Sequence, residues 1–244
     1  GFDNGIGTEH PSEQFVSDTG PRLIESAPPG SCVYKGADYY TEDYYRRGQS
    51  CGVSLYEDYR WMPETTLRLA MALIDLATIP REQPILDYGC ARGYLVKAFR
   101  LLFRDAYGMD HSQWAVENAD PVVHDYIRLV REGYRWPLDT MTFHTIVAKD
   151  VMEHLRPDQV NPLLQRFRAK GQQLVVIVSL GDGEHFTIPY MEEEPDHTLR
   201  HPLWWWREQC ERARWVIQVA TNRVEGIKDQ WRDYPNGHGI VYAR

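Results

Sequence analysis

The sequence is poor in several features that would each mark a particular class of protein. Its four cysteines, Cys32, Cys51, Cys90 and Cys210, are scattered without metal-ligand or redox spacing, so we expect no disulfide framework. The longest apolar run, 174–178, is far shorter than the roughly 20 residues that a membrane-spanning helix needs. No secretory leader pattern opens the chain. We therefore expect a cytoplasmic protein without a membrane span.

Positive charge is also scarce, because 27 Lys and Arg stand against 35 Asp and Glu, for a formal net charge of −8. Proteins that grip nucleic acids usually carry a basic stripe, so we expect no nucleic-acid partner. The 244 residues, 43% of them hydrophobic, suffice for one large core with an appended lid. A homodimer is compatible with this composition.

Three regions differ in their residue pattern. Residues 1–31 are rich in Gly, Pro, Ser and acids and have no apolar period, which predicts a mobile N-terminal arm. Residues 32–80 are dense in aromatics and predict a helical lid followed by the first core helix, which begins at Pro63 and ends before Pro80. The alternative for the lid is a packed helical pair with its phenols at the surface. Residues 81–244 form the expected core domain.

Strand and helix patterns alternate through this core. Strands are expected at 84–88, 106–109, 126–130, 143–148, 174–180, 215–221 and 239–242. Helices are expected near 94–103, 112–119, 160–169 and 202–212. Such alternation is typical of an α/β fold. We predict a doubly wound, Rossmann-like, seven-stranded and mostly parallel sheet with helices on both faces and an N-terminal helical lid.

The first strand–loop–helix unit is the expected ligand site, because open α/β sheets bind ligands beyond the carboxyl ends of their strands. Asp87 closes the strand, and the loop from Gly89 to Gly93 uses small residues that let the backbone approach a ligand. Asp110, about twenty residues further on, closes the second strand, where a carboxylate can accept hydrogen bonds from ribose hydroxyls.

Two classes of ligand compete for this site. A dinucleotide would call for G-x-G-x-x-G, which the loop lacks. Asp87 would also repel a pyrophosphate, whereas it suits a cationic amino group. Asp110 is compatible with both classes. In the simpler structural alternative, Asp87 caps the loop and Asp110 caps the next helix.

The segment 86–93, with the sequence LDYGCARG, resembles the first motif of class I S-adenosylmethionine-dependent methyltransferases, L-D-x-G-x-G-x-G. The segment 107–112 resembles their second motif. The segments 136–138 and 143–155, which ends in KDVMEHL, resemble the later L-P-F and D-V-x-E-H-L regions. The similarity extends from about residue 85 to residue 180. It implies a methyltransferase that binds S-adenosyl-L-methionine and releases S-adenosyl-L-homocysteine.

Carried over residue by residue, the resemblance implies a set of contacts with the methyl donor. Asp87 would hold its amino group, the loop would pass under its methionine part, and Asp110 would hold its ribose. The complete set of implied cofactor-binding residues is Asp87, Gly89, Cys90, Ala91, Gly93, Asp110, His111 and Glu132 near the adenine, and Asp150 at the end of the fourth strand. Two positions depart from the family pattern. Ala91 replaces a glycine, which is acceptable if its φ is negative, and Phe143-His144 replaces Phe-Asp.

If the acceptor is a hydroxyl, a general base assists methyl transfer, and histidine has a suitable pKa. His154 lies close to the expected donor site, but Glu153-His154-Leu155 recurs in the superfamily, so a structural role is favoured over catalysis. The segment 181–201, after the fifth strand, is the expected substrate loop, and within it His197, or else His185, is the candidate base.

The same loop is rich in carboxylates. Without a ligand spacing signature, a solvated acidic loop is favoured over a metal site, and no metal ligand is assigned. The segment 196–198 and the Trp-rich helix after it resemble methyltransferases of bacterial glycan and surface-polysaccharide clusters. Trp204, Trp205 and Trp206 cannot all face inward on one helix, so some pack in the core and one remains for the lid or the acceptor.

These features favour a methyltransferase that acts on a small molecule or glycan, with O-methylation as the expected reaction. A nucleotide-dependent oxidoreductase and a non-catalytic donor-binding module are the alternatives. The acceptor, any metal dependence and the oligomeric state are not encoded in a readable motif.

Overall fold

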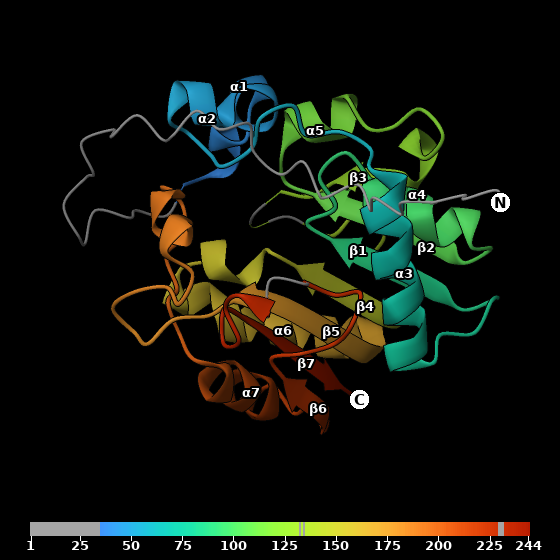
Figure 1. Ribbon diagram of the computed structural model, residues 1–244. Coiled ribbons are helices and arrows are strands. Elements are labelled where there is room, and N and C mark those ends of the chain that lie inside the picture. The colour runs from blue at the N-terminus through green and yellow to red at the C-terminus, as the bar shows by residue number, and fades with distance from the viewer. Residues whose placement is uncertain (1–34, 132, 134, 229–231) are drawn as a thin grey trace, which may run out of the picture. The chain divides into compact units, whose positions relative to one another are not determined.

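The computed structural model describes residues 35–131, 133, 135–228 and 232–244. Its sheet has seven strands in the order β3-β2-β1-β4-β5-β7-β6 (Figure 1). The strands are β1 Pro84–Tyr88, β2 Asp105–Asp110, β3 Ile127–Leu129, β4 Phe143–Lys149, β5 Gly171–Ser179, β6 Ile217–Thr221 and β7 His238–Ala243. Of these seven strands, only β7 is antiparallel to its neighbours, β5 and β6. The predicted seven-stranded, mostly parallel sheet is confirmed. The predicted arm at 1–31 lies outside the described residues.

The helices follow the strands as the sequence predicts. The helices that pack around the core strands are α3 Pro63–Ala77, α4 Tyr94–Leu101, α5 Gln113–Glu117, α6 Pro157–Lys170 and α7 Leu203–Arg212. Short helices and turns are η1 Ala37–Tyr39, α1 Glu42–Arg46, α2 Gly48–Cys51, η2 His124–Tyr126, η3 Met152–His154 and η4 Pro189–Glu193. Two local signals act as expected. Pro63 occupies the first turn of α3, and the Ser112 hydroxyl caps α5 by accepting a hydrogen bond from the amide of Ala115 at 3.0 Å.

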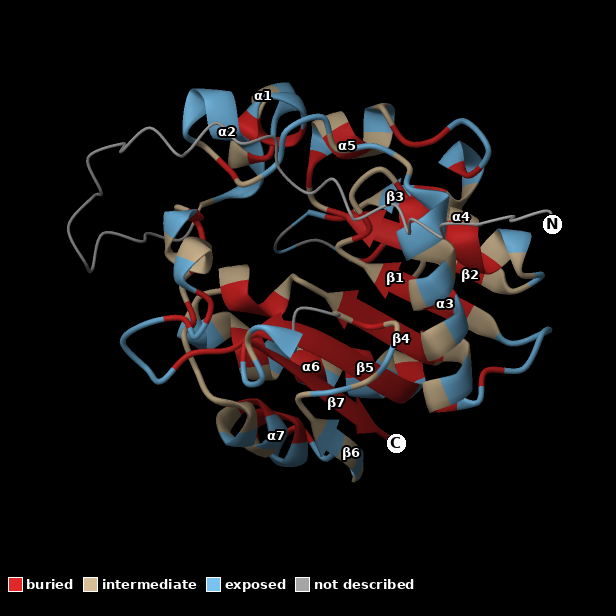
Figure 2. Ribbon diagram, in the orientation of Figure 1, coloured by how far each residue is buried: buried red, intermediate tan, exposed pale blue. Residues whose placement is uncertain are grey.

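The core has two layers because alternate strand residues point to opposite faces of the sheet. On one face, residues such as Ile85 and Val147 pack against α3 and α4. On the other, Leu86 and Ile146 pack against α6 and α7. Figure 2 shows the central strands as buried ribbon between helices whose outer faces are exposed. Each such side chain contributes about 1.5–3 kcal/mol of burial free energy, which holds helices on both faces as predicted.

The strand order reverses between β1 and β4, and this switch point positions the site. β1 pairs with β2 on one side and with β4 on the other, with Asp87 opposite Gly108 and Val147. Because all three strands are parallel, their carboxyl ends meet at one edge of the sheet. Asp87, Asp110 and Lys149 therefore lie at the same edge.

The N-terminal segment 35–61 covers part of this edge. Tyr40, Tyr44 and Tyr45 are buried in one cluster with Ala115 of α5. The Ser112 hydroxyl donates to the carbonyl of Tyr40 at 2.5 Å, which ties the segment to the end of β2. The alternative with surface phenols does not hold for these three tyrosines. A lid function for the segment remains a prediction.

The three consecutive tryptophans of α7 have three different environments. Trp206 is 1% exposed and belongs to the core, whereas Trp204 is 65% exposed. Trp205 stacks on His201 with ring centroids 3.8 Å apart. None of the described helices combines the length and the apolar character that crossing a bilayer requires.

Candidate functional site

The loop after β1 is held close to the rest of the sheet edge. The amides of Gly89 and Cys90 donate to the carbonyl of Met109 at 2.8 and 3.1 Å. Gly89 has φ +78°, and a Cβ there would lie 2.2 Å from Val151 Cγ2. Cys90 turns its thiol toward Gly108 of β2, so only its backbone faces a ligand. The loop therefore offers its backbone rather than its side chains, as a ligand passing over it requires.

Two further loop residues have left-handed backbone. Gly93, with φ +78°, ends the loop and begins α4. Ala91 has φ +47°, so the condition of a negative φ, under which alanine would replace the family glycine easily, is not met. An alanine in this region is strained by its Cβ, about 1–2 kcal/mol for an L-residue. The surrounding hydrogen bonds hold it there.

The carboxylate of Asp110 helps to hold Ala91 in this backbone conformation. Its Oδ2 accepts from the amide of Ala91 and its Oδ1 from the amide of Ser112, both at 2.7 Å. The carboxylate is 5% exposed and retains a second lone pair on each oxygen, which can accept ribose hydroxyls. Ser112, and not Asp110, caps α5. The geometry thus fits the predicted role of Asp110 in holding a ribose.

Asp87 is buried at the end of β1, and burial raises the pKa of its carboxyl to about 7. The charge of Lys149 opposes that rise, and the charge of Asp110 adds to it. Among the described residues, no hydrogen-bond donor stabilises the ionised form of this carboxyl. A ligand ammonium placed beside it would supply that stabilisation, so the residue fits the amino group of the expected methyl donor.

A hollow of about 460 Å³ lies between the N-terminal segment and the ends of β2 and β3. The rings of His111 and Tyr40 are 4.5 Å apart along it, which suits a planar base. Its lining consists of Ala37, Asp38, Tyr40, Thr41, His111, Gln113, Trp114, Leu129 and Arg131. The predicted place of the adenine, beside His111, therefore borders this hollow. Glu132, the other residue expected near the adenine, lies outside the described residues.

Asp150 follows β4 directly and has φ +54°. Its Oδ2 lies 2.5 Å from the ammonium of Lys149 and 2.6 Å from that of Lys228. Burial acts to raise the pKa of this carboxyl, but the two lysines and His238 hold it well below its usual range. Asp150 is thus an ionised group beside the donor loop, with two cations attached.

A second cluster of titratable side chains lies where η3 meets the substrate loop. Nδ1 of His154 lies 2.9 Å from Oδ2 of Asp196, which is completely buried. Burial alone would lower the pKa of His154, but the charge of Asp196 outweighs it and raises the pKa to about 9. The hydroxyl of Tyr40 also interacts with Asp196. At neutral pH the His154 ring is therefore protonated on both nitrogens and positively charged.

The neighbouring His197 has the opposite protonation state. Its ring centroid is 4.6 Å from that of His154, and burial together with the His154 charge lowers its pKa to about 3. Its Nδ1 lies 3.2 Å from the carbonyl of Met191. Because a carbonyl only accepts, Nδ1 carries the hydrogen and Nε2 is left as the proton acceptor. This is the tautomer that a general base requires.

The two halves of the substrate loop differ in exposure. The first half has a fully exposed stretch, 182–185, which ends in His185, and the amide of His185 donates to Asp182 in this turn. The second half is not a solvated acidic loop, and that interpretation was wrong there. Glu194, Asp196 and His197 are at most 5% exposed because the N-terminal segment covers them. Glu194, for example, accepts from the amide of Leu55 at 2.7 Å.

Sequence patterns did not reveal the lysine pair or the partner of His154. Lys149 had one signal, a cation that ends a buried apolar strand. Lys228 lies between β6 and β7, far from any motif, and only the fold brings it to β4. Asp196 stands inside a segment with many acids, so sequence alone could not distinguish it from them.

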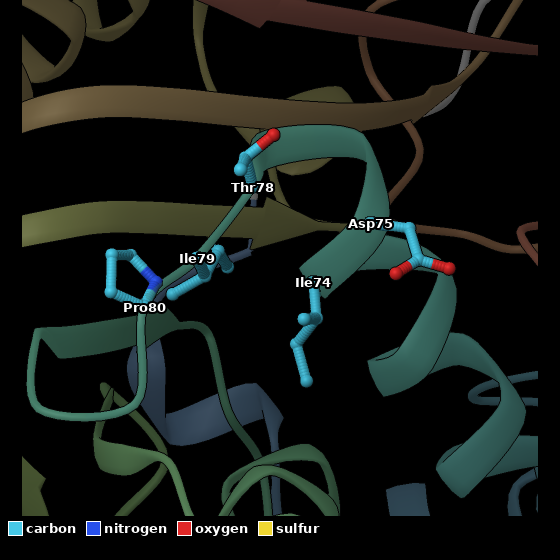
Figure 3. A pocket seen from close by; sticks show the side chains of 5 residues that line it. All are labelled: Ile74, Asp75, Thr78, Ile79 and Pro80. Carbon is cyan, nitrogen blue, oxygen red and sulfur yellow. The ribbon is translucent and has the colours of Figure 1, made fainter.

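Two other observations concern metal binding and a second hollow. Within the described part of the chain, no group of three or more His, Cys, Asp or Glu side chains is arranged to hold a metal ion. A further hollow of about 440 Å³ lies at the end of α3, lined by Ile74, Asp75, Thr78, Ile79 and Pro80 (Figure 3). It precedes β1 and so lies near the amino ends of the strands, away from the site.

Comparison with known proteins identifies the family of this chain. A family model described as a methyltransferase domain matches residues 57–222. A search of curated protein sequences found no match.

Many solved structures share the fold, and three illustrate it. A glycopeptide N-methyltransferase, MtfA, complexed with sinefungin has a TM-score of 0.55 at 14% identity, over 79% of this chain and 90% of that one. A mitomycin 7-O-methyltransferase, MmcR, has a TM-score of 0.54 at 14% identity, over 74% and 53%. A geranyl diphosphate C-methyltransferase from Streptomyces coelicolor A3(2) has a TM-score of 0.53 at 13% identity, over 71% and 78%. At these identities the likeness shows the fold.

Proposed function

This chain belongs to the methyltransferase domain family, and from that premise we propose that it transfers a methyl group from S-adenosyl-L-methionine to a hydroxyl of a small molecule or glycan. One observation carries the donor assignment. Two buried carboxylates, Asp87 and Asp110, close neighbouring parallel strands on either side of a loop built mostly of small residues. That arrangement complements a ligand with an ammonium at one end and a ribose at the other.

The residues of this edge would hold the donor as follows. Asp87 faces the ammonium, Asp110 accepts from the ribose hydroxyls, and the hollow beside His111 takes the adenine. When bound, the donor supplies an electrophilic methyl carbon on a sulfonium. The protein's contribution is then to hold this carbon in line with the acceptor oxygen, because methyl transfer is a direct displacement.

His197 is proposed as the general base. Its pKa, lowered to about 3, keeps the ring neutral but makes it a weak base, so Nε2 would accept the proton only as the O–C bond forms and makes the hydroxyl strongly acidic. The Met191 carbonyl fixes the tautomer in which Nε2 is the acceptor. Asp196, which acts to raise the pKa of His197, stabilises the charge that the ring acquires. His154 is already protonated and paired with Asp196, so its proposed role is to hold the cluster together.

The N-terminal segment would act as the lid that excludes water. It buries the acidic half of the substrate loop and contributes Tyr40 to the hollow. The net charge of −8 supports a small-molecule or glycan acceptor over a nucleic acid. The structural neighbours include a glycopeptide N-methyltransferase and a mitomycin 7-O-methyltransferase, and acceptors of these kinds agree with the proposed class.

Two measurements test the proposal. Calorimetric titration should show binding of S-adenosyl-L-homocysteine and none of NAD. Transfer from methyl-labelled donor should then be assayed on hydroxyl-bearing glycosides and natural products, with tRNA and protein as competing acceptors. Binding of NAD instead would indicate the oxidoreductase alternative. Donor binding without transfer to any acceptor class would indicate a non-catalytic module.

A further inference from the structure

Two lysine ammonium groups converge on one carboxylate oxygen at the end of β4. Lys149 and Lys228 lie 2.5 and 2.6 Å from Oδ2 of Asp150. The other oxygen, Oδ1, is buried and has no hydrogen-bond partner among the described residues. Buried polar atoms are nearly always paired. Nine described side-chain atoms are exceptions, and Oδ1 is the one whose carboxylate also holds two ammonium groups, which indicates a place for a ligand group.

Two members of this cluster have strained backbone conformations. Asp150 has φ +54° and Lys228 has φ +52°, a region that non-glycine residues rarely adopt. Strain of this kind persists where the surrounding structure over-determines it, and it concentrates at functional sites. Asp150 and Lys228 are two of the seven described non-glycine residues with positive φ, and these two meet in one ion pair.

Two lysines share one carboxylate oxygen in this cluster, and burial together with the charge of Lys149 lowers the pKa of Lys228, although Asp150 opposes that lowering. Burial and the charge of Lys228 lower the pKa of His238 to about 3, so this ring is neutral. Burial raises the pKa of Glu153, which favours its neutral form. Asp150 is then the one carboxylate held firmly ionised beside two ammonium groups. An added anion beside Lys228 would stabilise its ammonium form.

The position of the cluster favours the acceptor over the methyl donor as the source of that anion. Val151, next to Asp150, packs against Gly89 of the donor loop, so the cluster borders the donor site. Lys228 and His238, however, come from the β6–β7 connection and from β7. These lie beyond β5, on the side of β4 opposite β1. The expected substrate loop follows β5 on that side.

We propose that Lys149 and Lys228 form a subsite for an oxyanion, a carboxylate or phosphate, carried by the methyl acceptor. Oδ1 of Asp150 accepts a hydrogen bond from a hydroxyl next to that group. The acceptor is therefore an acidic molecule, such as a sugar acid or sugar phosphate. This inference rests on the proposed methyltransferase function, and it names the class of acceptor.

The probe is inorganic phosphate, titrated calorimetrically into the full chain already saturated with S-adenosyl-L-homocysteine. We expect millimolar binding that Lys228→Gln weakens by about tenfold or more, since a charge-assisted contact is lost. Lys228→Arg keeps the charge and should retain binding. Lys170→Gln is the matched control, because Lys170 also pairs with an aspartate, Asp139, at 2.8 Å and is similarly buried. It should leave phosphate affinity unchanged.

The outcomes separate the inference from the proposed function. If S-adenosyl-L-homocysteine binds but wild-type protein binds no phosphate at tens of millimolar, the subsite is refuted, even if Lys228→Gln fails to fold. Equal phosphate binding by the wild type and Lys228→Gln also refutes it. If Lys228→Gln instead weakens S-adenosyl-L-homocysteine and spares phosphate, the lysine serves the donor carboxylate. Failure of the wild type to bind S-adenosyl-L-homocysteine would contradict the proposed function itself.

Discussion

His154 and Asp196 form an ion pair across the base of the candidate site, with 2.9 Å between Nδ1 and Oδ2 and the aspartate fully buried. His154 ends η3, directly after β4, whereas Asp196 lies in the loop after η4. Because removing one partner of a buried pair leaves an uncompensated charge, the two segments are coupled strongly. Burial, together with the charge of His154, keeps the neighbouring His197 neutral.

Replacement of Asp196 by asparagine should lower the pKa of His154 from about 9 toward or below the ordinary value of 6.5. A histidine whose folded pKa is raised contributes stability that is complete below the unfolded pKa and is lost as pH rises through the folded value. Wild-type protein should therefore lose up to about 3 kcal/mol more stability than Asp196→Asn between pH 6.5 and 9.

The measurement is urea unfolding of both proteins across this pH range, with NMR titration of the His154 ring as the direct readout. Burial also raises the pKa of Glu194, to about 7, so stability curves alone would mix two groups. An unchanged His154 titration in Asp196→Asn would show that the ion pair does not set this pKa.

Replacement of His197 by alanine should lower the rate of methyl transfer by about 100-fold or more, the usual contribution of a general base. Affinity for S-adenosyl-L-homocysteine should stay the same, because His197 lies with the substrate loop rather than the donor loop. Single-turnover rates and calorimetry measure the two effects separately. His185→Ala, in the exposed half of the same loop, is the control and should keep full activity. A fully active His197→Ala variant would remove this residue from the mechanism.

Replacement of Asp110 by alanine should weaken binding of S-adenosyl-L-homocysteine by more than about tenfold, since charge-assisted hydrogen bonds to the ribose are lost. The variant also loses the acceptors for the amides of Ala91 and Ser112, so its folding must be checked by circular dichroism. Asp110→Asn keeps two acceptor lone pairs and should bind with intermediate affinity. Unchanged affinity in a folded alanine variant would contradict the donor assignment.

Replacement of Gly89 by alanine should destabilise the fold by about 2 kcal/mol or more, because it combines a left-handed backbone with a steric clash. The added Cβ would lie 2.2 Å from Val151 Cγ2. Gly52→Ala is the matched control, since Gly52 has φ +65° but no atom within 4 Å of the position that an added Cβ would take. Urea unfolding of the two variants separates backbone strain from the clash. Equal losses would show that the contact with Val151 is unimportant.

The elements of the fold were predictable because each rests on local patterns. Continuous apolar stretches such as 174–178 mark strands buried on both faces, and Pro63 and Ser112 mark helix starts through capping chemistry. Ala91 shows the limit of such reasoning. A residue type constrains φ only statistically, and here hydrogen bonding to Asp110 holds an alanine in left-handed backbone.

By itself, the sequence determined the order of the chemical groups along the chain: an acid, a small-residue loop and a second acid, which parallel pairing must bring to one edge. Only the tertiary structure decided which remote groups meet there. Burial and distance, which no spacing encodes, pair His154 with Asp196, leave His197 neutral and bring Lys228 to Asp150. Electrostatic interactions depend on separation in space and on exclusion of water, and both arise only when the chain has folded.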